Sequence, residues 1–170
     1  MRCFIGVPLS DDVRRELIRI QGELKKSTTK MKLVEPENLH ITLRFLGDIG
    51  DSEVSKITEK LKEISVGKFA VTFSHLGAFP SKNYMRVIWV GVSQGREELT
   101  ELHRQVGGKE KKFEPHVTLA RVKTKPDKML VDLLGKTLNL PMNVDKVQLV
   151  ESKLTPKGPI YSKVFEIELR

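Results

Sequence analysis

Apolar positions recur with two different periods along the chain, and each period predicts one type of secondary structure. Apolar residues three or four apart predict amphipathic helices at residues 11–26, 52–64, 97–106 and 126–134. Short runs rich in β-branched and aromatic residues predict strands at residues 2–7, 31–34, 39–46, 69–80, 84–92, 113–122, 142–151 and 160–169. Ser10 suits the N-cap of the first helix, Asp51 or Ser52 that of the second, and Pro126 can start the fourth.

The order of these elements predicts the fold class. Helices and strands are mixed, but several successive strands are joined by short turns, which favours an α+β fold with largely antiparallel pairing. After an opening strand, the series helix, strand, helix, hairpin occurs twice along the chain. We therefore expect residues 1–170 to form a single bilobal domain, in which two pseudo-symmetric units flank a central cleft.

The charge of the chain adds a class of partner to this picture. The formal net charge is +8, which favours polyanionic partners, nucleic acid first. The alternative is a lysine-rich surface held by ion-pair networks, as in heat-stable proteins. The single Cys3 excludes an internal disulfide framework, and no apolar run is long enough to span a membrane. We expect a cytoplasmic, monomeric protein without a membrane partner.

Two matching strand motifs carry the candidate chemistry. His40-Ile41-Thr42-Leu43 and His116-Val117-Thr118-Leu119 both read His-x-Thr-x with aliphatic residues at the x positions. Side chains alternate between the faces of a strand, so His and Thr share one face while the aliphatic residues share the other. Two such strands side by side would bring two imidazoles and two hydroxyls to one cleft.

This set of groups suits in-line displacement at a phosphate ester. One imidazole can take a proton from the nucleophile while the other gives a proton to the leaving oxygen, because the usual pKa of histidine is about 6.5. The threonine hydroxyls can donate hydrogen bonds to the non-bridging oxygens. The chemistry requires no metal and no cofactor. A zinc site is the rival interpretation, but neither motif has a carboxylate on its histidine face.

The other two histidines have no such motif around them. His75 lies in a predicted strand and His103 in the middle of a predicted helix. We expect surface or structural roles for both.

The motifs, with Arg44-Phe45-Leu46-Gly47 after the first and Phe113-Glu114-Pro115 before the second, resemble the two signatures of the 2H phosphoesterase superfamily. The resemblance is to its RNA 2′,3′-cyclic phosphodiesterase branch, historically called 2′-5′ RNA ligase, and covers nearly the whole chain. It implies a metal-independent enzyme that hydrolyses the terminal 2′,3′-cyclic phosphate of RNA, including tRNA fragments, to a 2′-phosphate. It also implies reversible 2′-5′ RNA ligase activity and a role in RNA processing.

The resemblance further implies roles for individual residues. His40 and His116 would be the acid and the base, and the sequence does not say which residue has which role. Thr42 and Thr118 would bind the phosphate. Arg121 matches a family arginine that contacts the phosphate, although strict alternation places it on the face opposite His116 unless a bulge intervenes. Alternation places Arg44 on the His40 face, as a second phosphate contact. The alternative for each arginine is a surface ion pair.

Aromatic residues close to the motifs are candidates for stacking on a base. These are Phe45, Phe113 and Tyr161. Phe45 falls on the aliphatic face of its strand, so we expect it in the core. Two other functions stay open at this point: a domain that binds RNA ends without turnover, and an enzyme acting on small cyclic nucleotides.

Overall fold

The computed structural model describes residues 1–170, which form nine strands, four α-helices and one short 3₁₀ helix. The strands are β1 (Arg2–Pro8), β2 (Met31–Leu33), β3 (His40–Asp48), β4 (Phe69–Ser81), β5 (Tyr84–Val92), β6 (His116–Val122), β7 (Thr137–Val144), β8 (Lys146–Thr155) and β9 (Gly158–Glu168). The helices are α1 (Asp11–Leu24), α2 (Asp51–Lys62), α3 (Arg96–Gln105) and α4 (Lys128–Leu133), and the 3₁₀ helix is Pro36–Asn38.

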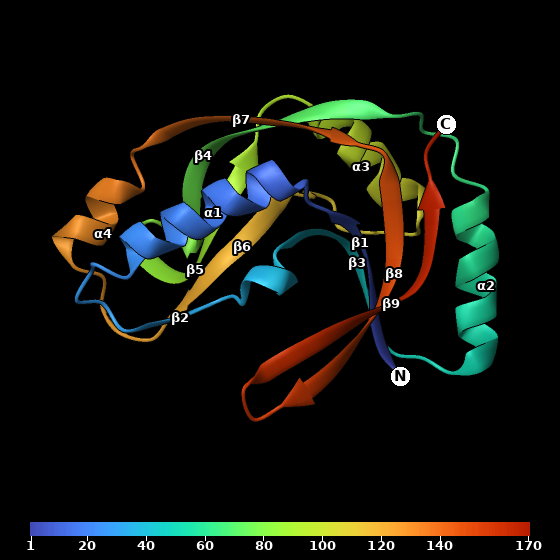
Figure 1. Ribbon diagram of the computed structural model, residues 1–170, viewed down its shortest axis with the longest axis horizontal. Helices are drawn as coiled ribbons and strands as arrows, with labels where there is room; N and C mark the ends of the chain where they lie inside the picture. Colours follow the sequence, from blue (N-terminus) through green and yellow to red (C-terminus); the bar gives the residue numbers. More distant parts are fainter.

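The nine strands form one antiparallel sheet whose order is β7-β4-β5-β6-β3-β1-β8-β9, with β2 added beside β6. The strands fall into two half-sheets, β7-β4-β5-β6 and β3-β1-β8-β9, which diverge in Figure 1. A single residue pair, Ile41 with Val117, connects them. The α+β class, the antiparallel pairing and the duplicated arrangement of strands are confirmed.

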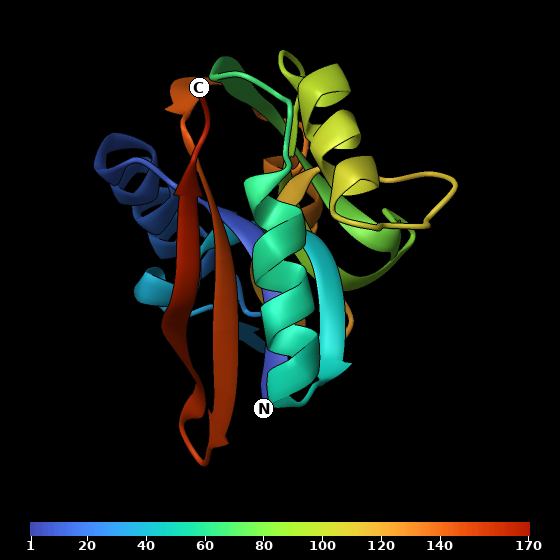
Figure 2. The ribbon, with the colours of Figure 1, turned by 90° about the vertical axis from the view of Figure 1, so that its right-hand side faces the viewer.

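Each long helix contacts strands that lie far from it in the sequence. Helix α1 follows β1 but packs on β6 and β7 of the other half-sheet, and α3 follows β5 but packs on β3. Helix α2 lies along β9, beside the second half-sheet (Figures 1 and 2). No α-helix of the protein has the length and apolar character that crossing a bilayer requires.

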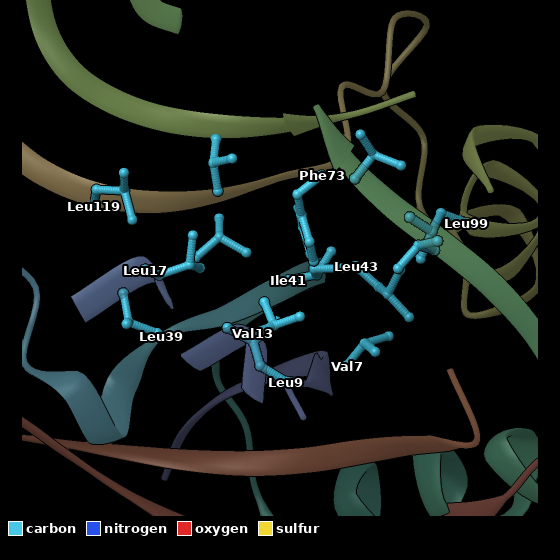
Figure 3. Close-up of a cluster of buried hydrophobic side chains, with 14 of the residues drawn as sticks. Val7, Leu9, Val13, Leu17, Leu39, Ile41, Leu43, Phe73, Leu99 and Leu119 are labelled. Carbon is cyan, nitrogen blue, oxygen red and sulfur yellow. The ribbon is translucent and has the colours of Figure 1, made fainter. Parts of the chain in front are cut away.

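The core lies on the side of the motif strands that faces away from the histidines. Ile41 and Leu43 of β3 are fully or almost fully buried and lie among the side chains of α1, α3 and β4 in Figure 3. They belong to one continuous cluster of 35 buried apolar residues. Because these aliphatic side chains are buried, His40 and Thr42, which alternate with them along the strand, point toward the opposite face.

Three sequence-based expectations about local structure are wrong. The single strand expected at residues 142–151 is two strands, because the chain leaves the first half-sheet as β7 and enters the second as β8, with a break at Asp145. Helix α4 does not start at Pro126. The carboxylate of Asp127 accepts a hydrogen bond from the Leu130 N–H and caps the helix instead. The N-cap of α2 is Gly50, one residue before the expected positions.

A buried glutamine joins α1 to the half-sheet that carries the second motif. Gln21 is 4% exposed, and its side-chain amide donates hydrogen bonds to the carbonyls of Val34 at 2.9 Å and Leu119 at 3.0 Å. The Val34 N–H also donates to the Leu119 carbonyl, at 2.9 Å. These bonds fix the end of β2 against β6 in the motif that contains His116.

We predict that Gln21→Met lowers the free energy of unfolding by about 1–3 kcal/mol, because the partly buried Val34 carbonyl loses its hydrogen-bond donor. Urea unfolding followed by circular dichroism measures the change. Gly22→Ala, on the neighbouring residue, is the control. A Cβ there would meet no atom within 4 Å, so this change should raise the free energy by about 0.5–1 kcal/mol. Equal stabilities of Gln21→Met and the wild type would contradict the assigned role.

Candidate active site

The two His-x-Thr-x motifs meet where the half-sheets join. Strands β3 and β6 run antiparallel, and Ile41 lies opposite Val117. Continued by one residue each way, this register sets His40 across from Thr118 and Thr42 across from His116, on one face. The four predicted groups therefore come together, although only this one pair of residues joins the two strands.

His40 is held in one tautomer by the backbone. Its Nδ1 lies 2.6 Å from the carbonyl oxygen of Asn38, and because a carbonyl can only accept, Nδ1 carries the hydrogen. Its Nε2 lies 2.6 Å from Thr42 Oγ1 and faces the cleft. The ring of Phe4 stacks on the imidazole at 4.5 Å between centroids, and Tyr161 contacts it edge-on.

His116 is held in the same way from the other half-sheet. Its Nδ1 donates to the carbonyl oxygen of Glu114 at 2.6 Å, again two residues earlier in the chain. Its Nε2 is thereby left for the cleft. The rings of Phe79 and Trp89 lie 5.0 and 6.0 Å from the imidazole centroid. Both histidines thus present the same nitrogen to the same space.

The surroundings shift the pKa of each histidine in the same direction. Burial lowers the pKa of His40, the bond to the Asn38 carbonyl opposes this shift, and the nearby His116 adds to it. Burial also lowers the pKa of His116, whereas the Glu114 carbonyl and carboxylate oppose the shift. The neutral imidazole is therefore favoured at both positions, and His116 alone has a carboxylate close by.

The side chain of Glu114 is itself fixed by an ion pair. Arg96, the first residue of α3, donates two hydrogen bonds to its carboxylate, at 2.8 and 2.9 Å, and a further one to the Val92 carbonyl. This guanidinium lowers the pKa of Glu114. Glu114 is thus fixed through its carboxylate, which binds Arg96, and through its carbonyl, which binds His116.

Glycines allow the strands beside the motifs to come close. A Cβ at Gly6 of β1 would lie 2.8 Å from the Ile41 carbonyl oxygen and 3.2 Å from Cδ2 of His40. On the other side, Gly91 of β5 lies opposite His116, and the space that a Cβ there would need is occupied by the rings of His75 and Trp89. Sequence reasoning did not identify Gly6, Asn38 or Phe4, because their contributions are a missing side chain, a backbone carbonyl and a contact across strands.

Arg121 reaches the histidine face through a bulge in β6. Ile88 pairs with Ala120 while Trp89 pairs with Thr118, so Leu119 is an extra residue in the strand. Leu119 and Ala120 are consecutive and both fully buried, which breaks the alternation. The next side chain, Arg121, therefore lines the cleft with His116 and Thr118. The bulge that the sequence required for this placement is present.

Arg44 also lines the cleft, but part of its guanidinium is engaged elsewhere. Its Nη1 donates to the Val106 carbonyl at 2.8 Å. The neighbouring Gly107, with φ of +90°, leaves room for it, since a Cβ there would lie 2.5 Å from Nη1. Arg44 thus fastens the loop after α3 to the first motif strand.

The cleft that collects these groups has a volume of about 360 Å³. Its lining includes both histidines and both threonines, the two arginines, and four aromatic rings, namely Phe45, Phe79, Phe113 and Tyr161. The expectation that Phe45 lies in the core is wrong. Residues Leu43 and Leu46 are extra residues in the β1–β3 pairing, and between them Phe45 turns outward and is 76% exposed.

The remaining histidines do not line the cleft. His103 is 3% exposed, bonds through Nδ1 to the Leu43 carbonyl and stacks on Phe113. His75 bonds to Ser74 Oγ at 2.8 Å. No group of three or more His, Cys, Asp and Glu side chains is arranged to hold a metal ion.

Comparisons with known proteins agree with this arrangement. The family described as LigT like Phosphoesterase matches residues 7–89 and, a second time, residues 90–161. Each matched segment contains one motif. An RNA 2′,3′-cyclic phosphodiesterase of Archaeoglobus fulgidus is 40% identical over 98% of this chain and 100% of its own length. One of Methanothermobacter thermautotrophicus is 35% identical over 95% of each.

Solved structures show the same fold. A crystal structure of a Thermus thermophilus protein has a TM-score of 0.85 and 28% identity, over 100% of this chain and 98% of that one. The apo form of Escherichia coli LigT has a TM-score of 0.79 and 20% identity, over 99% and 96%. The chain therefore belongs to the LigT-like phosphoesterase family, a family of 2H phosphoesterases, and is an enzyme.

Proposed function

We propose that this enzyme hydrolyses the terminal 2′,3′-cyclic phosphate of RNA to a 2′-phosphate, with His40 and His116 as its acid and base. The observation that carries the proposal is the meeting of the two motifs at the Ile41–Val117 pair, where both imidazoles turn Nε2 into one cleft. The relatives named RNA 2′,3′-cyclic phosphodiesterase support it, as does the net charge of +8, which attracts the RNA backbone.

The proposed step needs only the groups that line the cleft. One neutral imidazole takes a proton from water as the water oxygen forms a bond to phosphorus. The other imidazole, protonated, gives its proton to the ribose 3′ oxygen as the bond from phosphorus to that oxygen breaks. The product carries one more negative charge than the cyclic ester. The positive charge of the nearby Arg121 stabilises this additional negative charge. A ribose hydroxyl in place of water would give the 2′-5′ ligase reaction.

The threonines suit the non-bridging oxygens of the phosphate. Each lies across from the histidine of the other strand, so the two hydroxyls can approach the phosphorus from the two half-sheets. In the free enzyme Thr42 Oγ1 lies 2.6 Å from His40 Nε2 and donates to it when the ring is neutral. When Nε2 is protonated it donates to Thr42 instead, and the hydroxyl hydrogen is free for a phosphate oxygen. The exposed ring of Phe45 offers a stacking surface for a base. We further propose that residues 1–170 act as one domain, since each half-sheet supplies half of these groups.

Replacing either catalytic histidine should remove most of the activity. We predict that His40→Asn and His116→Asn each lower kcat by about 10²–10⁴-fold, because each removes one partner of the proton transfer. The substrate is an oligoribonucleotide with a 2′,3′-cyclic phosphate end, incubated in EDTA, and the product is identified by chromatography. His75→Asn is the matched control and should turn over near the wild-type rate. A near-normal rate in either His40→Asn or His116→Asn would contradict the two-histidine mechanism.

The pH dependence should report both imidazoles. One must be neutral and the other protonated, so kcat/KM should follow a bell-shaped curve. Burial lowers both pKa values, so both limbs of the curve should lie below the usual histidine pKa of about 6.5. Rates measured across pH at low substrate concentration test this. A curve with one limb, or with both limbs above that value, would contradict the assignment.

The threonine hydroxyls should affect the chemical step more than binding. We predict that Thr42→Val and Thr118→Val each lower kcat by about 10²–10³-fold, the effect of losing one donor to a developing oxyanion. Valine keeps the shape and the strand preference of threonine. Thr42→Ser and Thr118→Ser retain the hydroxyl and should retain most of the rate. If serine and valine variants were equally slow, the hydroxyls would not be the donors.

A further inference from the structure

A second cavity opens beside the catalytic cleft and shares a wall with it. This side pocket has a volume of about 200 Å³ and is bounded by Lys32 of β2, Arg121 of β6, and Lys157 at the turn between β8 and β9. Val34, Asn38, Arg121 and Tyr161 line both cavities. The side pocket is thus a continuation of the cleft toward the hairpin tip.

The side pocket holds positive charge that the protein does not neutralise. In the pairing of β2 with β6, Lys32 lies directly opposite Arg121, a like-charge pair that destabilises a sheet. Neither residue, nor Lys157, forms an ion pair. Glu35 is the one acidic residue of the lining, so three cations face one carboxylate. A bound anion would relieve this repulsion.

The hairpin that contributes Lys157 is held in place. The Asn38 side chain donates to the Pro159 carbonyl at 2.9 Å, and Thr155 Oγ1 donates to the Gly158 carbonyl at 2.6 Å. A Cβ at Gly158 would lie 3.6 Å from Lys32 Nζ, so the lysine ammonium reaches the turn. In Figure 1 the hairpin bends away from the sheet toward the 3₁₀ helix and β2. The position of the hairpin therefore brings Lys157 close to Lys32 and Arg121.

We propose that the side pocket binds the phosphate on the 5′ oxygen of the terminal nucleotide, which in RNA is the phosphodiester to the preceding nucleotide. The proposal rests on the proposed function, because it takes the cyclic phosphate to lie between His40 and His116. A pocket of about 200 Å³ holds a phosphate group but is smaller than the usual site of a whole small-molecule ligand. The enzyme thereby distinguishes an RNA end from a free nucleoside cyclic phosphate.

Three substrates test this: adenosine 2′,3′-cyclic phosphate, its 5′-phosphorylated form, and the dinucleotide with the same cyclic end. The wild type should show kcat/KM at least about tenfold higher for the dinucleotide than for the unphosphorylated nucleoside, as charge-assisted contacts give. The variant Lys32→Gln/Lys157→Gln should lose this ratio and keep its rate on the nucleoside. Lys56→Gln/Lys68→Gln, which removes two exposed lysines elsewhere, should keep the ratio.

Two further measurements isolate the phosphate charge. A dinucleotide with a neutral methylphosphonate linkage should lose the advantage with the wild type, and should react with the double variant like the normal dinucleotide. The slope of log kcat/KM against log salt should flatten by about 0.7 for each phosphate that the variant no longer neutralises.

The outcomes separate this proposal from the function on which it rests. If the nucleoside and the dinucleotide react equally well with the wild type, the side pocket assignment fails while the phosphodiesterase function stands. If the double variant slows all substrates equally, the lysines do not act on the 5′ phosphate. If kcat/KM is raised only for the 5′-phosphorylated nucleoside and not for the dinucleotide, the pocket binds free nucleotides rather than RNA. If no substrate is hydrolysed, the proposed function fails as well.

Discussion

The pairing of Ile41 with Val117 is the one backbone connection between the two motif strands, and the arrangement of the cleft depends on it. If more residues of β3 and β6 were paired, the two strands would lie side by side along their length, and the half-sheets would form one continuous sheet. With none, the histidines would have no fixed separation. A single pair holds the register while the strands diverge, so the space for a phosphate is a property of the backbone.

The orientation of each imidazole is likewise set by the backbone. Many histidines that act in catalysis receive their tautomer from a carboxylate, which also stabilises the imidazolium. Here the carbonyls of Asn38 and Glu114 fix the tautomer without adding a full charge. Burial is then the largest influence on the pKa of both residues, and the Glu114 carboxylate acts on His116 alone.

The sequence predicted the parts of the site that depend on repeated pattern, and failed where the pattern is broken. The two motifs, the strand faces of His40 and Thr118, and the helix stripes all follow from simple periodicity. Phe45 was misplaced because two extra residues in β3 reverse its face, and nothing in the local sequence marks them. The break at Asp145 was missed because apolar residues recur on both sides of it, and only the choice of partner strands separates β7 from β8.

The exchange of strands between the two halves of the chain has a consequence for how the protein is made. Strands β1 and β3 leave the ribosome early, but their half-sheet is completed by β8, where Glu151 pairs with Cys3. Such distant contacts slow folding, because the loop must close before the contact stabilises anything. The edge of β1 that pairs with β8 therefore stays open until β8 has been synthesised. Until then the nascent chain carries an unpaired strand edge, which is the kind of edge that promotes aggregation.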